Sequence, residues 1–338
     1  MQSRHCRDKS LAEAMASPMI TTYQSRISIE RIAEAAERIA PVFRNTPQFV
    51  SESLSESLGV RLLVKVECVN PIRSFKGRGT DYLLFRDGDE SEPLVAASAG
   101  NFGQGLAYAA RQRNRPVILF AAITANSLKI DRMRALGAEV RLGGEDFDAA
   151  KVIAREFADS QGLRFVEDGR EPAITEGAGT IAVELSRWAE PIDMIFVPVG
   201  NGALINGIGR WLKAHAPKCR VVGVCTTRAP AMAESWSAGS LRTTNSADTI
   251  ADGIAVRVPV PEALSDMRHS VDEMMLVSEE RLLEAMRLVH DHLGLVCEPA
   301  GVAGLAAVMD SRDRLAGKLV AVPLCGGNLT PEQIRMWL

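Results

Sequence analysis

Lysine is scarce in this chain of 338 residues, because only 8 of its 39 basic residues are lysines and the rest are arginines. Histidine and cysteine are also few, at five and six residues, and they form neither CxxC pairs nor zinc-type spacings. We therefore expect no metal site. The scattered cysteines favour free thiols in a reducing compartment, which predicts a cytoplasmic protein.

Long apolar runs are absent as well, since no stretch approaches the roughly 18 to 20 residues of a membrane span. The net charge of -3 gives no electrostatic reason to expect nucleic acid or an anionic membrane as partner. With 46% hydrophobic residues the chain can bury a large core. We expect a small-molecule ligand and a homodimer.

A regular alternation of short apolar strands and helices begins near residue 94 and resumes after residue 175. This alternation indicates crossover connections and a parallel sheet. We predict a two-domain, three-layer α/β/α protein with mostly parallel sheets. Its expected parts are a mobile tail of residues 1–27, a large domain of residues 28–91 and 166–338, and a small mobile domain of residues 92–165. Residues 238–264 are polar and are interpreted as a loop.

Three glycine-rich loops follow predicted strands: SAGNFGQG from Ser98, GNGALING from Gly200, and CGGN from Cys325. Ligands of open parallel sheets bind at the carboxyl ends of the strands. A glycine loop that leads into a helix suits a phosphate, although simple turn chemistry would also explain it. A dinucleotide site is disfavoured, because the next strand ends in Cys225 and Thr226 instead of an acidic residue.

One of the few lysines, Lys76, lies in the motif SFKGRG between a predicted strand and a helix. A shielded lysine can lose its proton and form a Schiff base, whereas arginine keeps its charge. A solvated lysine in the first turn of a helix is the alternative interpretation.

These four motifs, in this order, resemble those of the fold-type II (tryptophan-synthase-like) pyridoxal-phosphate enzymes, and within them the serine/threonine dehydratase branch. The resemblance covers roughly residues 28–330. It implies that Lys76 carries pyridoxal 5'-phosphate, that Asn101 bonds the 3'-oxygen of the cofactor, and that Cys325 faces the pyridine nitrogen. The implied phosphate donors are Gly200, Asn201, Gly202, Ala203 and Leu204. The implied substrate loop is Ser98, Ala99, Gly100, Asn101 and Phe102.

The chain departs from the pattern of that branch at several positions. Asn201 and Ala203 replace two of the usual four glycines of the phosphate loop, and Phe102 replaces a usual histidine. Relatives with a divalent-cation site have a glutamate where this chain has Cys225, so the resemblance also implies no metal there.

The resemblance implies β-elimination, in which L-threonine and/or L-serine gives a 2-oxo acid and ammonia, with Lys76 as base in an apolar setting. Ala99 stands where serine racemases have a serine, which argues against racemisation. Ser98 has a second interpretation as a helix cap. The alternatives are a β-replacement synthase, a racemase, a lyase for another 3-substituted amino acid, and a non-enzymatic binding protein.

Overall fold

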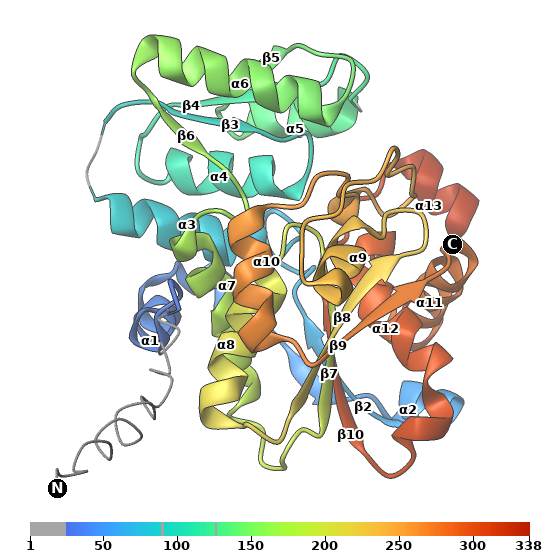
Figure 1. Ribbon diagram of the computed structural model, residues 1–338. Helices are drawn as coiled ribbons and strands as arrows, with labels where there is room; N and C mark the ends of the chain where they lie inside the picture. The colour runs from blue at the N-terminus through green and yellow to red at the C-terminus, as the bar shows by residue number, and fades with distance from the viewer. Residues whose placement is uncertain (1–24, 89–90, 126) are drawn as a thin grey trace, which may run out of the picture.

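The computed structural model describes residues 25–88, 91–125 and 127–338, and these form two sheets with helices on both faces of each (Figure 1). The larger sheet has the strand order β1-β2-β10-β7-β8-β9. All its neighbours are parallel except β1 and β2, which are antiparallel. Its strands are β1 (Gln48–Val50), β2 (Arg61–Val66), β7 (Met194–Pro198), β8 (Arg220–Thr226), β9 (Glu273–Val277) and β10 (Leu319–Leu324).

Alternate residues of the larger sheet pack into two separate cores. Phe196 belongs to the core shared with α2 (Glu52–Leu58), α11 (Glu279–Leu293) and α12 (Pro299–Asp310). Its neighbour Val197 belongs to the core beneath α7 (Pro172–Leu185) and α8 (Ala203–His215). Both side chains are fully buried, as expected for a sheet with two covered faces. Remaining helices around this sheet are α1 (Ile29–Arg38), α3 (Lys76–Asp87), α9 (Ala231–Ala238), α10 (Pro261–Ser270) and α13 (Pro331–Trp337).

The smaller sheet, at the top of Figure 1, is wholly parallel with the strand order β5-β4-β3-β6. Its strands are β3 (Leu94–Ala97), β4 (Val117–Ala121), β5 (Glu139–Leu142) and β6 (Arg164–Val166). Helices α4 (Asn101–Arg111), α5 (Ser127–Ala135) and α6 (Phe147–Gln161) alternate with these strands in the chain. The predicted mostly parallel α/β fold is confirmed, and the antiparallel strand β1 was not foreseen.

The predicted tail of residues 1–27 lies mostly outside the described residues. Of its last residues, Ile27 is buried, and Arg26 forms an ion pair with Asp266 of α10 at 2.7 Å. Residues 238–264, interpreted as loop, contain the 3-10 turn Asp252–Ile254 and the start of α10. Within the described part of the chain, no helix is both long enough and apolar enough to cross a membrane.

Candidate active site

A single cavity of about 570 Å³ brings together the ends of strands from both sheets. Ala97 ends β3, Pro198 ends β7, and Cys325 directly follows β10. The cavity therefore lies at the carboxyl ends of strands, where the strand-end rule places ligands. Every predicted site residue lines this cavity: Lys76, Ser98, Ala99, Gly100, Asn101, Phe102, Gly200, Asn201, Gly202, Ala203, Leu204 and Cys325.

Lys76 is the first residue of α3, and its ammonium group reaches the carboxylate of Asp168. The Nζ–Oδ2 distance is 2.5 Å, and the two side chains are 14% and 12% exposed. The Lys76 ammonium also lies 4.8 Å from the centre of the Phe75 ring. The expected apolar setting of Lys76 was therefore wrong, because the lysine faces a carboxylate as well as an aromatic ring. Nor is Lys76 a solvated side chain.

The side chain of Asn70 holds the loop before Lys76 through hydrogen bonds to the backbone of that loop. Asn70 Oδ1 accepts hydrogen bonds from the backbone N–H groups of Ile72 and Ser74, at 3.1 and 3.3 Å. Its amide donates to the carbonyl groups of Glu67 and Ser74. The Phe75 N–H donates to the Cys325 carbonyl at 3.0 Å. These bonds fix the start of α3 against the end of β10, so Lys76 and Cys325 line the same cavity.

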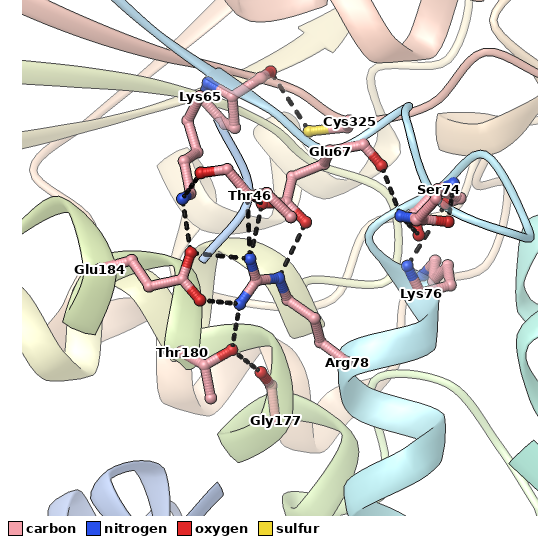
Figure 2. Close-up of polar contacts among 12 residues, drawn as sticks. Thr46, Lys65, Glu67, Ser74, Lys76, Arg78, Gly177, Thr180, Glu184 and Cys325 are labelled. Atoms are coloured by element: carbon pink, nitrogen blue, oxygen red, sulfur yellow. Dashed lines mark hydrogen bonds and ion pairs between the residues drawn. The ribbon is translucent and has the colours of Figure 1, made fainter. Parts of the chain in front are cut away.

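Two residues beyond Lys76, the guanidinium of Arg78 is completely buried between two carboxylates (Figure 2). It donates a pair of hydrogen bonds to Glu67, at 2.8 and 2.9 Å, and a second pair to Glu184, at 2.8 and 3.0 Å. Such bidentate pairs are the strongest and most directional contacts that arginine makes. Figure 2 shows Lys76 apart from this cluster, beside Ser74.

The same cluster includes the buried lysine of β2. Lys65 Nζ lies 2.5 Å from Glu184 Oε2 and donates to the Thr46 carbonyl at 2.8 Å. Two cations therefore balance two carboxylates. Burial alone would raise the pKa of Glu184, but the bonds from Arg78 and Lys65 hold it at about 2. We call Thr46, Lys65, Glu67, Arg78, Thr180 and Glu184 the buried charge network.

The substrate loop predicted from the sequence connects β3 to α4. Ser98 Oγ accepts hydrogen bonds from the N–H groups of Gly103, at 2.9 Å, and Gly100, at 3.2 Å. The helix-start contact suggested for Ser98 is therefore present. Asn101, the first residue of α4, donates to Glu298 Oε1 at 2.5 Å and accepts from the Asn328 amide at 2.8 Å. Its contact with the cofactor stays a prediction.

Glu298 was missed by the sequence reasoning, although it lies at the N-terminal end of α12 and lines the cavity. Burial and then the charge of Asp252 raise the pKa of Glu298 to about 7, against the opposing effects of Lys129, Asn101 and Asn328. A carboxyl group near neutrality can donate or accept a proton at physiological pH. No local sequence pattern pointed to Glu298, because its contacts with Asn101 and Asn328 join segments that are far apart in the chain.

The phosphate loop predicted from the sequence leads directly into α8. Gly202 has φ of +86°, a left-handed conformation that favours glycine, and Ala203 begins the helix. The first N–H groups of a helix have no partner within the helix, and the helix dipole favours an anion there. The replacement of two glycines by Asn201 and Ala203 therefore keeps the left-handed turn that the loop needs.

The turn that follows β6 packs against this loop. Gly169, with φ of +85°, lies so close that a Cβ atom on it would be 2.3 Å from the Asn201 carbonyl oxygen. A side chain at position 169 would push the two segments apart. Asp168, the neighbour of Gly169, is thus fixed relative to the phosphate loop.

Cys325 is 4% exposed, and its thiol lies 3.3 Å from the Pro323 carbonyl oxygen. Burial raises the pKa of the Cys325 thiol well above its usual value, and Glu67 and Glu298 add to the effect. A neutral thiol stabilises a neighbouring positive charge less well than a carboxylate would. Among the described residues, no group of three or more His, Cys, Asp or Glu side chains is arranged to hold a metal ion.

Ion pairs join the rim of the cavity on the small-sheet side to that on the large-sheet side. Lys129 of α5 pairs with Asp252, and Arg257 pairs with Asp148 of α6 at 2.6 Å. Residues 245–247 and 252–258 line the cavity, so the polar segment interpreted only as loop belongs to the site. Its lack of periodicity had hidden this role.

The arrangement suits pyridoxal phosphate, because the cavity offers a helix N-terminus for the phosphate, a lysine for the aldehyde, and an uncharged thiol in its wall. Together the fold and the site define a pyridoxal-phosphate enzyme of fold type II. The chain belongs to the family described as "Pyridoxal-phosphate dependent enzyme", whose model matches residues 39–326.

Individual relatives agree with this assignment. The chain is 34% identical over 310 residues to an L-threonine ammonia-lyase of Thermotoga maritima. The alignment covers 91% of this chain and 77% of that protein. Among solved structures it is similar to a threonine deaminase of T.th., with 32% identity, a TM-score of 0.84, and coverage of 90% and 99% of the two chains. A maize serine racemase has 26% identity and a TM-score of 0.86, over 92% and 96% of the chains.

Proposed function

We propose that this pyridoxal-phosphate-dependent ammonia-lyase converts L-threonine and/or L-serine into a 2-oxo acid and ammonia. The observation that carries the proposal is the convergence of Lys76, the substrate loop, the phosphate loop and Cys325 on one cavity. The names of the L-threonine ammonia-lyase and threonine deaminase relatives support the substrate class.

Pyridoxal phosphate, when bound, supplies the electron sink that weakens the bonds to the α-carbon of an amino acid. Lys76 would hold the cofactor covalently and later take the α-proton on its Nζ atom. Asp168, 2.5 Å away, would stabilise the ammonium group that results. The backbone N–H groups of the loop Ser98–Phe102 would hold the substrate carboxylate, and those at the start of α8 the phosphate.

Two residues of the cavity wall, Ala99 and Cys325, favour elimination over racemisation. Ala99 has no hydroxyl group to return a proton from the face opposite Lys76. The buried thiol of Cys325 would leave the ring nitrogen unprotonated, which disfavours a long-lived carbanion. Both arguments favour a reaction other than racemisation, the activity that the name of the maize serine racemase states.

Closure of the segment 92–165 over the site is part of the proposal. The pairs Lys129–Asp252 and Arg257–Asp148 link the two sides of the cavity and would exclude water when intact. Hydrogen exchange with an unreactive amino acid bound should show added protection at residues 98–105 and near residues 91 and 166. Absence of protection at residues 98–105 would mean that the carboxylate docks elsewhere.

A cytoplasmic location and a homodimer complete the proposal. The five cysteines of the described region, Cys68, Cys219, Cys225, Cys297 and Cys325, are all buried as free thiols, which suits a reducing compartment. Analytical ultracentrifugation of the purified protein tests the dimer, and a monomer at micromolar concentration would refute it.

The decisive experiment measures 2-oxo acid release from a panel of 3-substituted amino acids by the purified, cofactor-loaded protein. Release from threonine or serine without added thiol supports the lyase. Product that forms only with an added thiol would instead identify a β-replacement synthase. A colourless protein that gains no visible absorption band with pyridoxal phosphate would refute the enzyme altogether.

A further inference from the structure

Asp168 has a second carboxylate oxygen, Oδ1, that the proposed elimination from threonine does not use. It follows β6 by two positions and lines the cavity opposite Lys76. One of its oxygens, Oδ2, pairs with the lysine. The other, Oδ1, is buried and receives no hydrogen bond from any residue that the structure describes. A buried carboxylate oxygen without a partner is costly, so it indicates that something else supplies the partner.

The cavity also has more acidic than basic side chains. Its charged lining residues are four cations, Lys76, Lys129, Lys151 and Arg257, and six acids, Asp146, Asp148, Glu167, Asp168, Asp252 and Glu298. Three of the cations are occupied elsewhere: Lys129 by Asp252, Lys151 by Glu167 at 3.1 Å, and Arg257 by Asp148. Asp168 thus depends on Lys76 alone for a positive charge.

When Lys76 holds the cofactor covalently, its nitrogen would keep at most one hydrogen in place of three, so it would offer Asp168 fewer hydrogen-bond donors. Asp168 then has room for a second donor. A group at the β-carbon of the substrate lies within a few bonds of the α-proton that Lys76 removes, and Asp168 lies 2.5 Å from the Lys76 nitrogen. The β-substituent is therefore the natural second donor.

We propose that Asp168 is a specificity-determining residue, which lets the site accept an amino acid with an ammonium group on its β-carbon and makes it reject side chains that end in a carboxylate. The proposal rests on the proposed function, since it takes Lys76 as the base. An ammonium and a hydroxyl group both donate hydrogen bonds to a carboxylate, but only the ammonium neutralises its charge.

The chemistry of a β-ammonium group balances without an additional acid. Lys76 Nζ takes the α-proton, and the electron pair of that C–H bond forms the Cα–Cβ double bond. The Cβ–N bond breaks with its own electron pair, and the leaving group departs as neutral ammonia. Addition of one water then releases the second ammonia and a 2-oxo acid. A hydroxyl group, by contrast, needs a proton in order to leave as water.

The test compares L-serine with L-2,3-diaminopropionate, in which an ammonium group replaces the hydroxyl, at a pH that keeps the β-amino group protonated. In the cofactor-loaded protein, Asp168→Asn should lower the ratio of kcat/KM for L-2,3-diaminopropionate to that for L-serine by about tenfold or more, equivalent to about 1.4 kcal/mol. Asp168→Glu, which keeps the charge, should retain most of the ratio. An unchanged ratio in Asp168→Asn would overturn the proposal.

A second measurement does not depend on turnover. L-aspartate and L-alanine carry no good leaving group, so their binding can be followed through the visible absorption of the bound cofactor. Asp168→Asn should strengthen the binding of L-aspartate relative to L-alanine by about tenfold or more. Equal affinities for L-aspartate in the parent and the Asn variant would overturn the proposal.

Glu167→Gln is the matched control, because Glu167 is the chain neighbour of Asp168 and is already paired with Lys151 and Arg155. Glu167→Gln should change the kcat/KM ratio and the affinity for L-aspartate relative to L-alanine by less than about threefold each, because a charge that is already paired acts weakly on its surroundings. Equal changes in the two variants would mean that any lost carboxylate at the end of β6 has this effect, against the proposal. If no 2-oxo acid is released from serine or threonine, but L-aspartate binding still depends on Asp168, the proposed function fails and the charge selectivity stands.

Discussion

The two sides of the first turn of α3 handle buried charge in opposite ways. Behind the helix, Arg78 has two bidentate carboxylate partners and lies in a network of balanced charge. In front, Lys76 pairs with the carboxylate of Asp168, whose other oxygen receives no hydrogen bond from the described part of the chain. The fully bonded groups around Arg78 can only hold the helix in place, whereas the Lys76–Asp168 pair can still form new hydrogen bonds. Positions 76 and 78 thus separate reactivity from support within one helical turn.

The largest effect should come from replacing Lys76, the reactive residue of this helical turn. Lys76→Ala should lower 2-oxo acid release by roughly 10³-fold or more, since it removes both the covalent link and the base. Borohydride reduction of the parent protein followed by peptide mass analysis should place the cofactor on Lys76. A cofactor adduct on Lys65 or Lys129 would refute the assignment.

Replacing Arg78, which supports the helix, should lower the stability of the protein. Arg78→Met leaves Glu67 and Glu184 without their main partner, so the free energy of unfolding should fall by about 3–5 kcal/mol in urea titrations. Arg61→Met is the control, because its pair with Glu190 at 2.9 Å is half exposed and should contribute less than about 1 kcal/mol. Similar losses in the two variants would show that the network is no stronger than a surface pair.

Between the two extremes lies Glu298, which is buried but has a pKa near neutrality. In the unfolded chain its carboxyl group loses its proton near pH 4.5, and in the folded, cofactor-free protein near pH 7. Folded protein therefore binds the extra proton in this window, and its stability falls by about 3 kcal/mol as the pH rises through it. Glu298→Gln should remove this decline. Parallel stability curves for the two proteins from pH 4.5 to pH 7 would contradict the raised pKa.

The smallest effect should follow a change that keeps both sides intact. Cys325→Asp places a carboxylate in the cavity wall, where the neighbouring Glu67 and Glu298 disfavour it. We expect a modest shift from elimination towards racemised or transaminated product, because an acid near the ring nitrogen keeps it protonated. Chiral chromatography of the recovered amino acid measures this shift. An unchanged product ratio at full cofactor occupancy would show that Cys325 is not next to the nitrogen.

Much of the fold could be predicted from the sequence, and the predicted site residues share one cavity. Strand and helix alternation follows from local periodicity, and the glycine loops lie where parallel strands end, so Lys76 and Gly202 were found together. Asp168 was missed, although it follows β6 by two positions and the same strand-end rule applied to it. Glu298 and Asp252 depend on contacts between segments far apart in the chain, which no local pattern reveals.

The close contact of Gly169 with the Asn201 carbonyl has a consequence for how this site could change during evolution. Position 168 can accept other side chains without a shift of the backbone, because its side chain lines the cavity. Position 169 has no such latitude, since every other residue would displace the segment that leads into α8. New substrate preferences are therefore accessible through single substitutions at 168 that leave the segment leading into α8 in place. A library that varies both positions should return glycine at 169 in nearly every active clone.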